Sequence, residues 1–332
     1  MIDLSVLQTK LRTFHKPLSD SILEEFSPIA GNQFPGEFNV SGFHDKVLNL
    51  PDQPSSFWGV DRCLRIQETF DRTHSAIFHM GIFAKAVQLN ENFSDPFKDP
   101  RFHKLQSEMI LQFLELTKSL GIKDSDLETT YFGGCDVGGH PEGRDYLVKR
   151  RYPFPADKIS QGLLRIRRIK TYAVKSLANV DVQQHDLALV GPRMEVAAKG
   201  IEIGTIVFDC FRIKKDKLFP INYVAGYAIG LERITTVLRG EQNFLRAVPR
   251  YIRALNVLAT AMPSAKSTLI ETEVMKLIFG IEAIANIPKT LSVHQRMRLK
   301  QLTKTVEATA RDIAVSPRVV QRLLMFFKKG HT

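Results

Sequence analysis

The sequence contains little cysteine and no long hydrophobic run. Its three cysteines, Cys63, Cys135 and Cys210, are widely spaced and odd in number, which argues against a disulfide scaffold and against a cysteine-based zinc site. No apolar run approaches the roughly 20 residues that a membrane-spanning helix needs. The first residues carry lysine and arginine among polar residues instead of a secretory hydrophobic core. These absences predict a cytoplasmic protein with no membrane partner.

A phosphate-binding Walker loop is also missing. The glycine-rich stretch 133–146 lacks the G-K pair followed by serine or threonine, and it precedes no clear helix. We interpret this stretch as a loop. Within it, Cys135, His140 and Glu142 are spaced too irregularly to predict a metal site.

Charge is distributed unevenly along the chain. The 332 residues carry a formal net charge of +11. Residues 241–332 hold 15 Lys and Arg against 6 Asp and Glu, a net charge of +9, whereas residues 1–240 have a net charge of +2. This asymmetry suggests an anionic partner such as RNA. The alternative is a helical domain that its charge keeps soluble.

The most informative stretch is 223–240, YVAGYAIGLERITTVLRG. Its apolar residues alternate at first, as in a half-buried strand, and recur at helical spacing after Gly230. Gly226 and Gly230 predict a bend between strand and helix, and Gly240 predicts the helix end. Arg233 falls in the first helical turn, where the positive end of the helix dipole disfavours a cation. It is either a solvated surface charge or a residue that faces an anion such as a phosphate.

The run G-L-E-R that ends at Arg233 resembles the third signature motif of class II aminoacyl-tRNA synthetases, and its continuation to Gly240 is most similar to the alanyl branch. The resemblance implies an α+β fold, with an antiparallel β-sheet flanked by helices and a C-terminal helical domain. It implies a catalytic domain at residues 1–240 and a basic helical domain at residues 241–332. It also implies ATP and Mg²⁺ as cofactors, with Arg233 on the γ-phosphate.

Residues 57–85 predict an antiparallel hairpin of two strands joined by a short polar loop. The first strand ends in R-C-L-R at Arg65, similar to K-C-V-R in the second motif of alanyl enzymes. By this resemblance Arg65 contacts the ATP α-phosphate and the substrate carboxylate, since a fixed guanidinium stabilises the charge that develops on phosphoryl oxygens. In the return strand, His74 would touch a phosphate and Phe78 would stack on adenine. Packing roles explain His74 and Phe78 equally well.

Two candidate metal ligands follow further along the chain. Residues 191–195 resemble the alanyl G-P-C-S-E run, and residues 201–213 predict the strand that follows it. Strict alternation in that strand puts Glu202 on one face and Thr205 on the other. Glu195 and Glu202 are candidate Mg²⁺ ligands, because Mg²⁺ is held by one or two carboxylates together with phosphate oxygens.

The amino-acid pocket departs from the alanyl pattern. Gly226 stands where the alanyl motif has the aspartate that holds the ammonium group of alanine, and Gly204 stands where it has tryptophan. We therefore expect a substrate other than alanine, and a larger one, since both glycines would open space. Asp209 is a candidate replacement carboxylate. The predicted pocket residues are Thr205, Val207, Asp209, Gly226 and Ala228.

These features predict an ATP-dependent ligase that activates an amino acid, or a related carboxylate, as an acyl-adenylate. The acceptor would be tRNA, a carrier protein or a small amine, and a homodimer is compatible with the resemblance. The alternative is a non-catalytic, synthetase-like protein that binds RNA or regulates. A third interpretation is a basic nucleotide-binding protein in which G-L-E-R is fortuitous.

Overall fold

The computed structural model describes residues 4–19, 21–23, 39–40, 47, 49–65, 77–136, 153–174, 180–182, 189–214, 217–261, 268–287 and 293–328. The described strands form a 10-stranded sheet and a separate two-stranded sheet made of β6 (Cys135–Asp136) and β7 (Pro153–Phe154).

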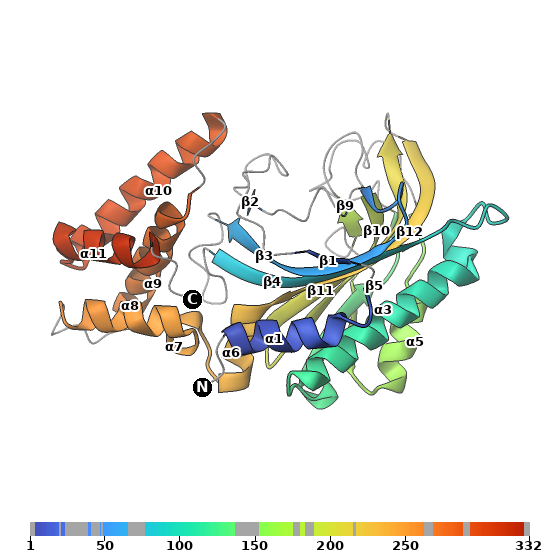
Figure 1. Cartoon of the computed structure of the whole chain (residues 1–332), viewed down its shortest axis with the longest axis horizontal. Coiled ribbons are helices and arrows are strands. Elements are labelled where there is room, and N and C mark those ends of the chain that lie inside the picture. The colour runs from blue at the N-terminus through green and yellow to red at the C-terminus, as the bar shows by residue number, and fades with distance from the viewer. Residues whose placement is uncertain are drawn as a thin grey trace.

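Neighbouring strands of the large sheet run mostly antiparallel (Figure 1). The order is β1-β3-β4-β12-β11-β10-β5-β8, with β2 beside β3 and β9 beside β10. Among the described pairs, β1–β3 and β5–β8 are parallel. The predicted α+β fold, with an antiparallel sheet flanked by helices, is confirmed. The strands are β1 (Ser21–Leu23), β2 (Asn39–Val40), β3 (Ser56–Arg65), β4 (Ile77–Val87), β5 (Leu127–Phe132), β8 (Lys170–Val174), β9 (Val180–Val182), β10 (Leu189–Ala198), β11 (Ile201–Lys214) and β12 (Lys217–Gly230).

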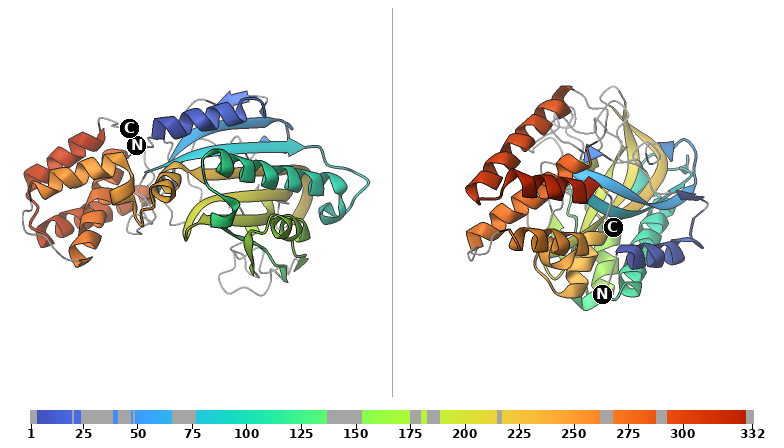
Figure 2. Two further views of the ribbon diagram at one scale, coloured as in Figure 1. Left: turned by 90° about the horizontal axis from the view of Figure 1, so that it is seen from below. Right: turned by 60° about the vertical axis from the view of Figure 1, so that its left-hand side comes forward.

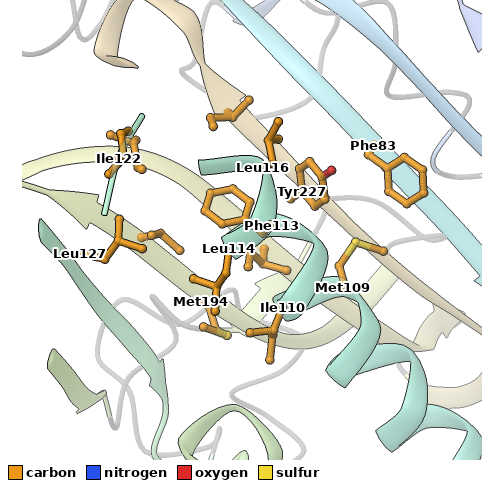
Figure 3. Packing of buried hydrophobic residues seen from close by; sticks show 14 of the residues in the cluster. Phe83, Met109, Ile110, Phe113, Leu114, Leu116, Ile122, Leu127, Met194 and Tyr227 are labelled. Atoms are coloured by element: carbon orange, nitrogen blue, oxygen red, sulfur yellow. The ribbon is translucent and has the colours of Figure 1, made fainter. Parts of the chain in front are cut away.

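In the described part of the chain before residue 200, three helices pack against one face of this sheet (Figures 1 and 2). The longest of them buries Leu105, Met109 and Phe113, which recur every three or four residues and so form one apolar stripe. Figure 3 shows this stripe packed against the sheet, where Phe113 lies beside Tyr227 of β12 at 5.3 Å between ring centroids. The helices are α1 (Leu4–His15), α3 (Pro100–Ser119) and α5 (Lys158–Ile166), and the 3-10 turns η1 (Pro96–Lys98) and η2 (Asp124–Asp126) flank α3.

The junction of strand and helix differs from the sequence prediction at one glycine. β12 continues through Gly226, which pairs with residues of β4 and of β11, so Gly226 lies within a strand and not in a bend. The strand ends at Gly230, and α6 (Leu231–Arg239) begins at the next residue. Gly240 ends the helix with a left-handed backbone, φ 68°, as predicted.

The helices after α6 gather at one end of the molecule around a second hydrophobic cluster that includes Tyr251, Phe279 and Leu323 (Figures 1 and 2). The predicted C-terminal helical region is confirmed. The last two helices are separated just before Pro317, because proline favours the first turn of a new helix. A domain boundary at residue 240 stays a prediction. The helices are α7 (Phe244–Ala247), α8 (Pro249–Ala259), α9 (Thr268–Ala285), α10 (Val293–Asp312) and α11 (Pro317–Lys328).

Within the described part of the chain, no helix combines the length and the hydropathy needed to cross a bilayer.

Candidate functional site

A β-bulge in β11 decides which side chains share a face. The pairing with β10 skips Ile203, because Glu202 and Gly204 pair with consecutive residues of β10. Residues paired across two strands have their side chains on the same face of the sheet. The extra residue therefore places the Glu202 side chain on the same face as that of Thr205. The prediction that these two residues lie on opposite faces is wrong, because it assumed a strand without an inserted residue.

Five polar side chains meet on this face, and we call them the charged cluster: Arg193, Glu195, Glu202, Thr205 and Arg233. Arg233 Nη1 donates to Glu202 Oε1 at 2.7 Å. Arg193 Nη2 lies 2.7 Å from Glu195 Oε1, and the Thr205 hydroxyl donates to Glu195 Oε2 at 2.6 Å. Four of these residues were predicted as site residues, Thr205 in the substrate pocket and Glu195, Glu202 and Arg233 at the ATP site, and the structure places them on one face.

Glu195 is the carboxylate of the charged cluster whose ionisation is most affected by its surroundings. Burial is the main cause that raises its pKa to about 7. Arg193 lowers the pKa, Glu202 raises it, and the Thr205 hydrogen bond lowers it. Glu195 is therefore partly protonated near neutral pH, and a cation placed beside both carboxylates would favour its ionised form.

Gly230 explains how Arg233 reaches this face from the start of a helix. A Cβ at Gly230 would lie 3.3 Å from Arg233 Cδ and 3.5 Å from Arg233 Cγ, so the aliphatic part of the arginine lies over the glycine backbone. Arg233 is 6% exposed, and a larger residue at position 230 would displace it. The spacing of G-L-E-R thus fixes the arginine against the end of β12.

The chemistry of the charged cluster suits an anion together with a divalent cation. The carboxylate of Glu202 is 43% exposed while its guanidinium partner is almost buried, so another oxyanion could take the same N–H groups. Two neighbouring carboxylates fit Mg²⁺, which completes its shell with phosphate oxygens and water. Among the described residues, no group of three or more His, Cys, Asp or Glu side chains is placed to hold a metal ion. With two carboxylates as donors, a bound Mg²⁺ would need phosphate oxygens or water to complete its shell.

The predicted pocket residues lie on neighbouring strands beside the charged cluster. Thr205 pairs with Ala228, and Val207 pairs with Gly226, so these four residues share the face of the cluster. Asp209 follows on the same strand and is fully buried, with 0% exposure. A substrate would reach Asp209 only after the chain around it moved, so its role as a replacement carboxylate stays a prediction.

The two glycines of the predicted pocket do not open space. A Cβ at Gly204 would lie 2.5 Å from the carbonyl oxygen of Ala228 and 3.0 Å from Phe113, on the face that α3 covers. A Cβ at Gly226 would lie 2.9 Å from the carbonyl oxygen of Phe83. The expectation of a larger substrate was based on empty space at these positions. That basis is wrong, because the Ala228 backbone and the Phe113 ring crowd Gly204, and the backbone of β4 crowds Gly226. The size of the substrate stays a prediction.

The remaining predicted ATP contacts are residues that the structure describes only in part or not at all. Arg65 ends β3, and Phe78 lies near the start of β4, so both belong to the predicted hairpin, but their side chains lie outside the described part of the structure. His74 lies outside the described residues altogether. The hairpin itself is confirmed, because β3 and β4 pair antiparallel from Ser56 to Leu64.

Arg193 is a cluster residue that the sequence analysis missed. It precedes Glu195 by two residues on β10, and period-two alternation puts such residues on one face. The sequence therefore contained a signal for Arg193, which was overlooked because the family motif has a small residue at this position.

A cavity of about 560 Å³ lies on the other face of the sheet, between α1, α3 and β4. Its lining is mainly apolar and includes Phe14, Phe83 and Met109, with Lys85 and Glu108 as an ion pair at 3.3 Å. Because it is on the α3 face, this cavity is separate from the predicted pocket.

Comparison with known proteins gives weak structural similarity and no sequence match. No protein-family model and no curated protein sequence matches the chain. Two solved structures of a pyrrolysyl-tRNA synthetase from Desulfitobacterium hafniense are similar at 12% sequence identity. Their TM-scores are 0.39 and 0.38, and the matches cover 74% of this chain and 73% and 70% of those chains. Because these values are low, no residue role, substrate or partner is transferred from those proteins.

Proposed function

We propose that this protein is an ATP-dependent ligase of class II aminoacyl-tRNA synthetase type, nearest to the alanyl branch by its sequence motifs. It would activate an amino acid or related carboxylate as an acyl-adenylate and release pyrophosphate. The observation that carries the proposal is the pairing of Arg233 with Glu202 at 2.7 Å, at the junction of an antiparallel sheet and the helix that G-L-E-R begins.

The charged cluster supports this chemistry without a nucleophilic side chain. Attack of a carboxylate on the α-phosphate needs orientation and charge neutralisation above all. In the proposal Arg233 binds the γ-phosphate through the N–H groups that donate a hydrogen bond to Glu202 in this structure. Glu202 and Glu195 hold Mg²⁺, which supplies positive charge to the phosphate oxygens. Arg193 and Thr205 orient Glu195 through the contacts already described.

The other predicted ATP contacts complete the proposal. Arg65 binds the α-phosphate and the substrate carboxylate, Phe78 stacks on adenine, and His74 touches a phosphate. The substrate side chain lies along Thr205, Val207, Asp209, Gly226 and Ala228. Because Gly226 provides no carboxylate, a zwitterionic amino acid loses an ion pair that is worth several kcal/mol when desolvated, on the order of 2–5 kcal/mol. Ordinary alanylation is therefore not the proposed activity.

The acceptor is proposed to be tRNA, with a carrier protein or small amine as alternatives. The basic excess of residues 241–332 favours tRNA over a neutral acceptor. We propose that residues 1–240 form the catalytic domain and that the helices after residue 240 serve the acceptor.

The proposal is tested by amino-acid-dependent exchange of labelled pyrophosphate into ATP, with a panel of amino acids and related carboxylates. Exchange with one acid, lost in Arg233→Ala, is the expected result. Lys118→Ala is a suitable control, because Lys118 is an exposed lysine on α3 away from the charged cluster. If the wild-type chain does not bind ATP, the proposal is contradicted.

A non-catalytic RNA-binding protein is the second candidate. It is favoured by the exposed basic residues of α10 and α11 and by the fact that both cluster arginines already have carboxylate partners. RNA binding together with no ATP binding would identify this candidate.

A further inference from the structure

A network of buried polar side chains joins the sheet to the C-terminal helices. It consists of Glu232 in α6, His79 in β4, Arg250 and Tyr251 in α8, and Glu282 in α9. Each of the five is at most 5% exposed. The network lies where the two hydrophobic clusters meet, since Met80, the neighbour of His79, packs against the C-terminal cluster.

Glu232 holds the first turn of α6. That helix begins after Gly230 without a side-chain cap, so its start needs another anchor. The backbone N–H of His79 donates to Glu232 Oε2 at 2.9 Å, and His79 Nδ1 lies 2.8 Å from Glu232 Oε1. These two contacts tie the beginning of α6 to β4, and a carboxylate also suits the positive end of the helix dipole.

Arg250 provides the third contact to Glu232, and it comes from the C-terminal helices. Its Nη1 lies 2.9 Å from Glu232 Oε1. Arg250 is in turn held from its own side, because Nε donates to Glu282 Oε1 at 2.7 Å and Nη2 donates to the Tyr251 hydroxyl at 3.0 Å. Burial alone would raise the pKa of Glu232, but Arg250 and His79 outweigh it and lower the pKa to about 2. The carboxylate therefore stays ionised and continues to bind its partners.

Arg233 is the next residue of the same helical turn. Consecutive helical residues point about 100° apart, so Glu232 and Arg233 leave α6 in different directions. Glu232 contacts β4 and α8, while Arg233 contacts Glu202 of β11. A rotation or shift of the first turn that follows from a change at Glu232 would move Arg233 as well, because the turn has no other side-chain cap.

We infer that Arg250 is a positioning residue for Arg233. Through Glu232, Arg250 fixes the position of the first turn of α6. The C-terminal helices therefore determine how tightly Arg233 binds the terminal phosphate of a nucleoside triphosphate. The inference rests on the proposed function, since it takes the γ-phosphate as the ligand of Arg233. It assigns the C-terminal helices a part in the ATP site in addition to any contact with an acceptor.

The test compares the dissociation constants of Mg·ATP and of AMP for the full chain and its Arg250→Lys variant. AMP lacks the phosphate that Arg233 would bind, so the ratio of the two dissociation constants reports on Arg233. This ratio does not change when a fraction of the molecules is unfolded. We expect Arg250→Lys to weaken ATP binding about tenfold while AMP binding changes little. Glu232→Asp, which keeps the charge but shortens the side chain, should weaken ATP binding selectively in the same way.

Arg246→Lys is the matched control, because Arg246 lies four residues before Arg250, in α7, and its side chain is exposed where it contacts Glu271 at 3.4 Å. It should leave both constants unchanged. In an Arg233→Ala background, Arg250→Lys should have no further effect on the ratio, because the residue through which it acts is gone.

Two outcomes would overturn the inference. The first is an unchanged ratio of the two constants in a folded Arg250→Lys protein, which includes an equal loss of ATP and AMP binding. The second is an additive effect in the double variant. If Arg233→Ala reduces ATP binding and Arg250→Lys does not, the proposed function stands and the positioning role fails. If the wild-type chain binds no ATP, both fail.

Discussion

Arg233 and Glu202 form an ion pair in which the arginine is almost buried and the carboxylate is 43% exposed. This difference in exposure between the two side chains matters for substitution experiments. Glu202 regains water when its partner is removed, so the cost to folding is small. The almost buried guanidinium, in contrast, has little access to water and is paired with the Glu202 carboxylate.

Arg233→Lys should therefore affect binding more than stability. Lysine keeps the charge but lacks the planar fork that donates two N–H groups to one oxyanion. We expect ATP affinity to fall about tenfold or more, corresponding to a loss of about 1.5–3 kcal/mol for a hydrogen bond to a charged group. Isothermal titration measures the affinity, and urea unfolding should show a change below about 1 kcal/mol. Equal ATP affinity in both proteins would contradict a role for Arg233.

Binding of Mg·ATP should become tighter as the pH rises through about 7. The pKa of Glu195 is raised to about 7, and only the ionised carboxylate can hold Mg²⁺. Affinity measured at about pH 6 should therefore be weaker than at about pH 8, and Glu195→Gln should remove most of this dependence. A wild-type affinity that does not vary over this range would exclude Glu195 as a ligand.

Gly204→Ala should destabilise the fold without acting through the substrate pocket. The added Cβ would lie 2.5 Å from the carbonyl oxygen of Ala228, and overpacking of this kind costs about 1–3 kcal/mol. Urea unfolding should report this loss. Gly200→Ala is an informative companion, because nothing lies within 4 Å of a Cβ there but φ is +79°, so it isolates backbone strain from steric contact. A Gly204→Ala protein of wild-type stability would mean that the strands can separate at this point.

Glu232→Gln should lower stability at neutral pH by an amount that shrinks in acid. The folded-state pKa of about 2 lies below the ordinary value of 4.5, so this carboxylate stabilises the fold above about pH 4.5 and loses that contribution as the pH falls through about 2. The difference between variant and wild type should be on the order of 3 kcal/mol near pH 7. Urea unfolding at several pH values checks the trend, and a constant difference would contradict it.

Changes on α10 should reduce the salt dependence of RNA binding. Lys300, Lys304 and Arg311 are exposed and fall on one stripe of that helix, which also carries Glu307. If they contact phosphates, changing all three to glutamine should lower the slope of log affinity against log salt by about 2. Fluorescence anisotropy with labelled tRNA measures the slope.

The matched control for α10 is a set of lysines with the same charge on the other side of the molecule. Changing Lys104, Lys118 and Lys123 to glutamine removes three exposed positive charges on and after α3. This variant should keep the wild-type slope. An equal reduction in both variants would mean that RNA responds to net charge and not to α10.

Local patterns in the sequence predicted several elements of the fold. Gly240 predicted the end of α6, because a helix end depends only on neighbouring residues. The predicted hairpin and the long strand at 201–213 were also confirmed as β3, β4 and β11. The family resemblance assigned Glu195, Glu202 and Arg233 to one ATP site, but it did not predict the direct contact between Arg233 and Glu202.

Features that depend on tertiary packing could not be predicted in this way. The bulge at Ile203 follows from the pairing with β10, and no period in β11 itself reveals it. Gly204 looked like an empty place in a pocket because the position of Phe113 in α3 was unknown. The contact of Arg250 with Glu232 joins two helices whose packing no local pattern specifies.

The inserted residue at Ile203 also has a consequence for protein engineering. Deleting Ile203 would restore a regular two-residue repeat and turn the Glu202 side chain toward the helices. Arg233 would then lose its acidic partner, although the rest of the sequence would be unchanged. Deleting this single isoleucine should therefore separate Glu202 from Arg233, and any substitution scan of this strand should count outward positions separately before and after it.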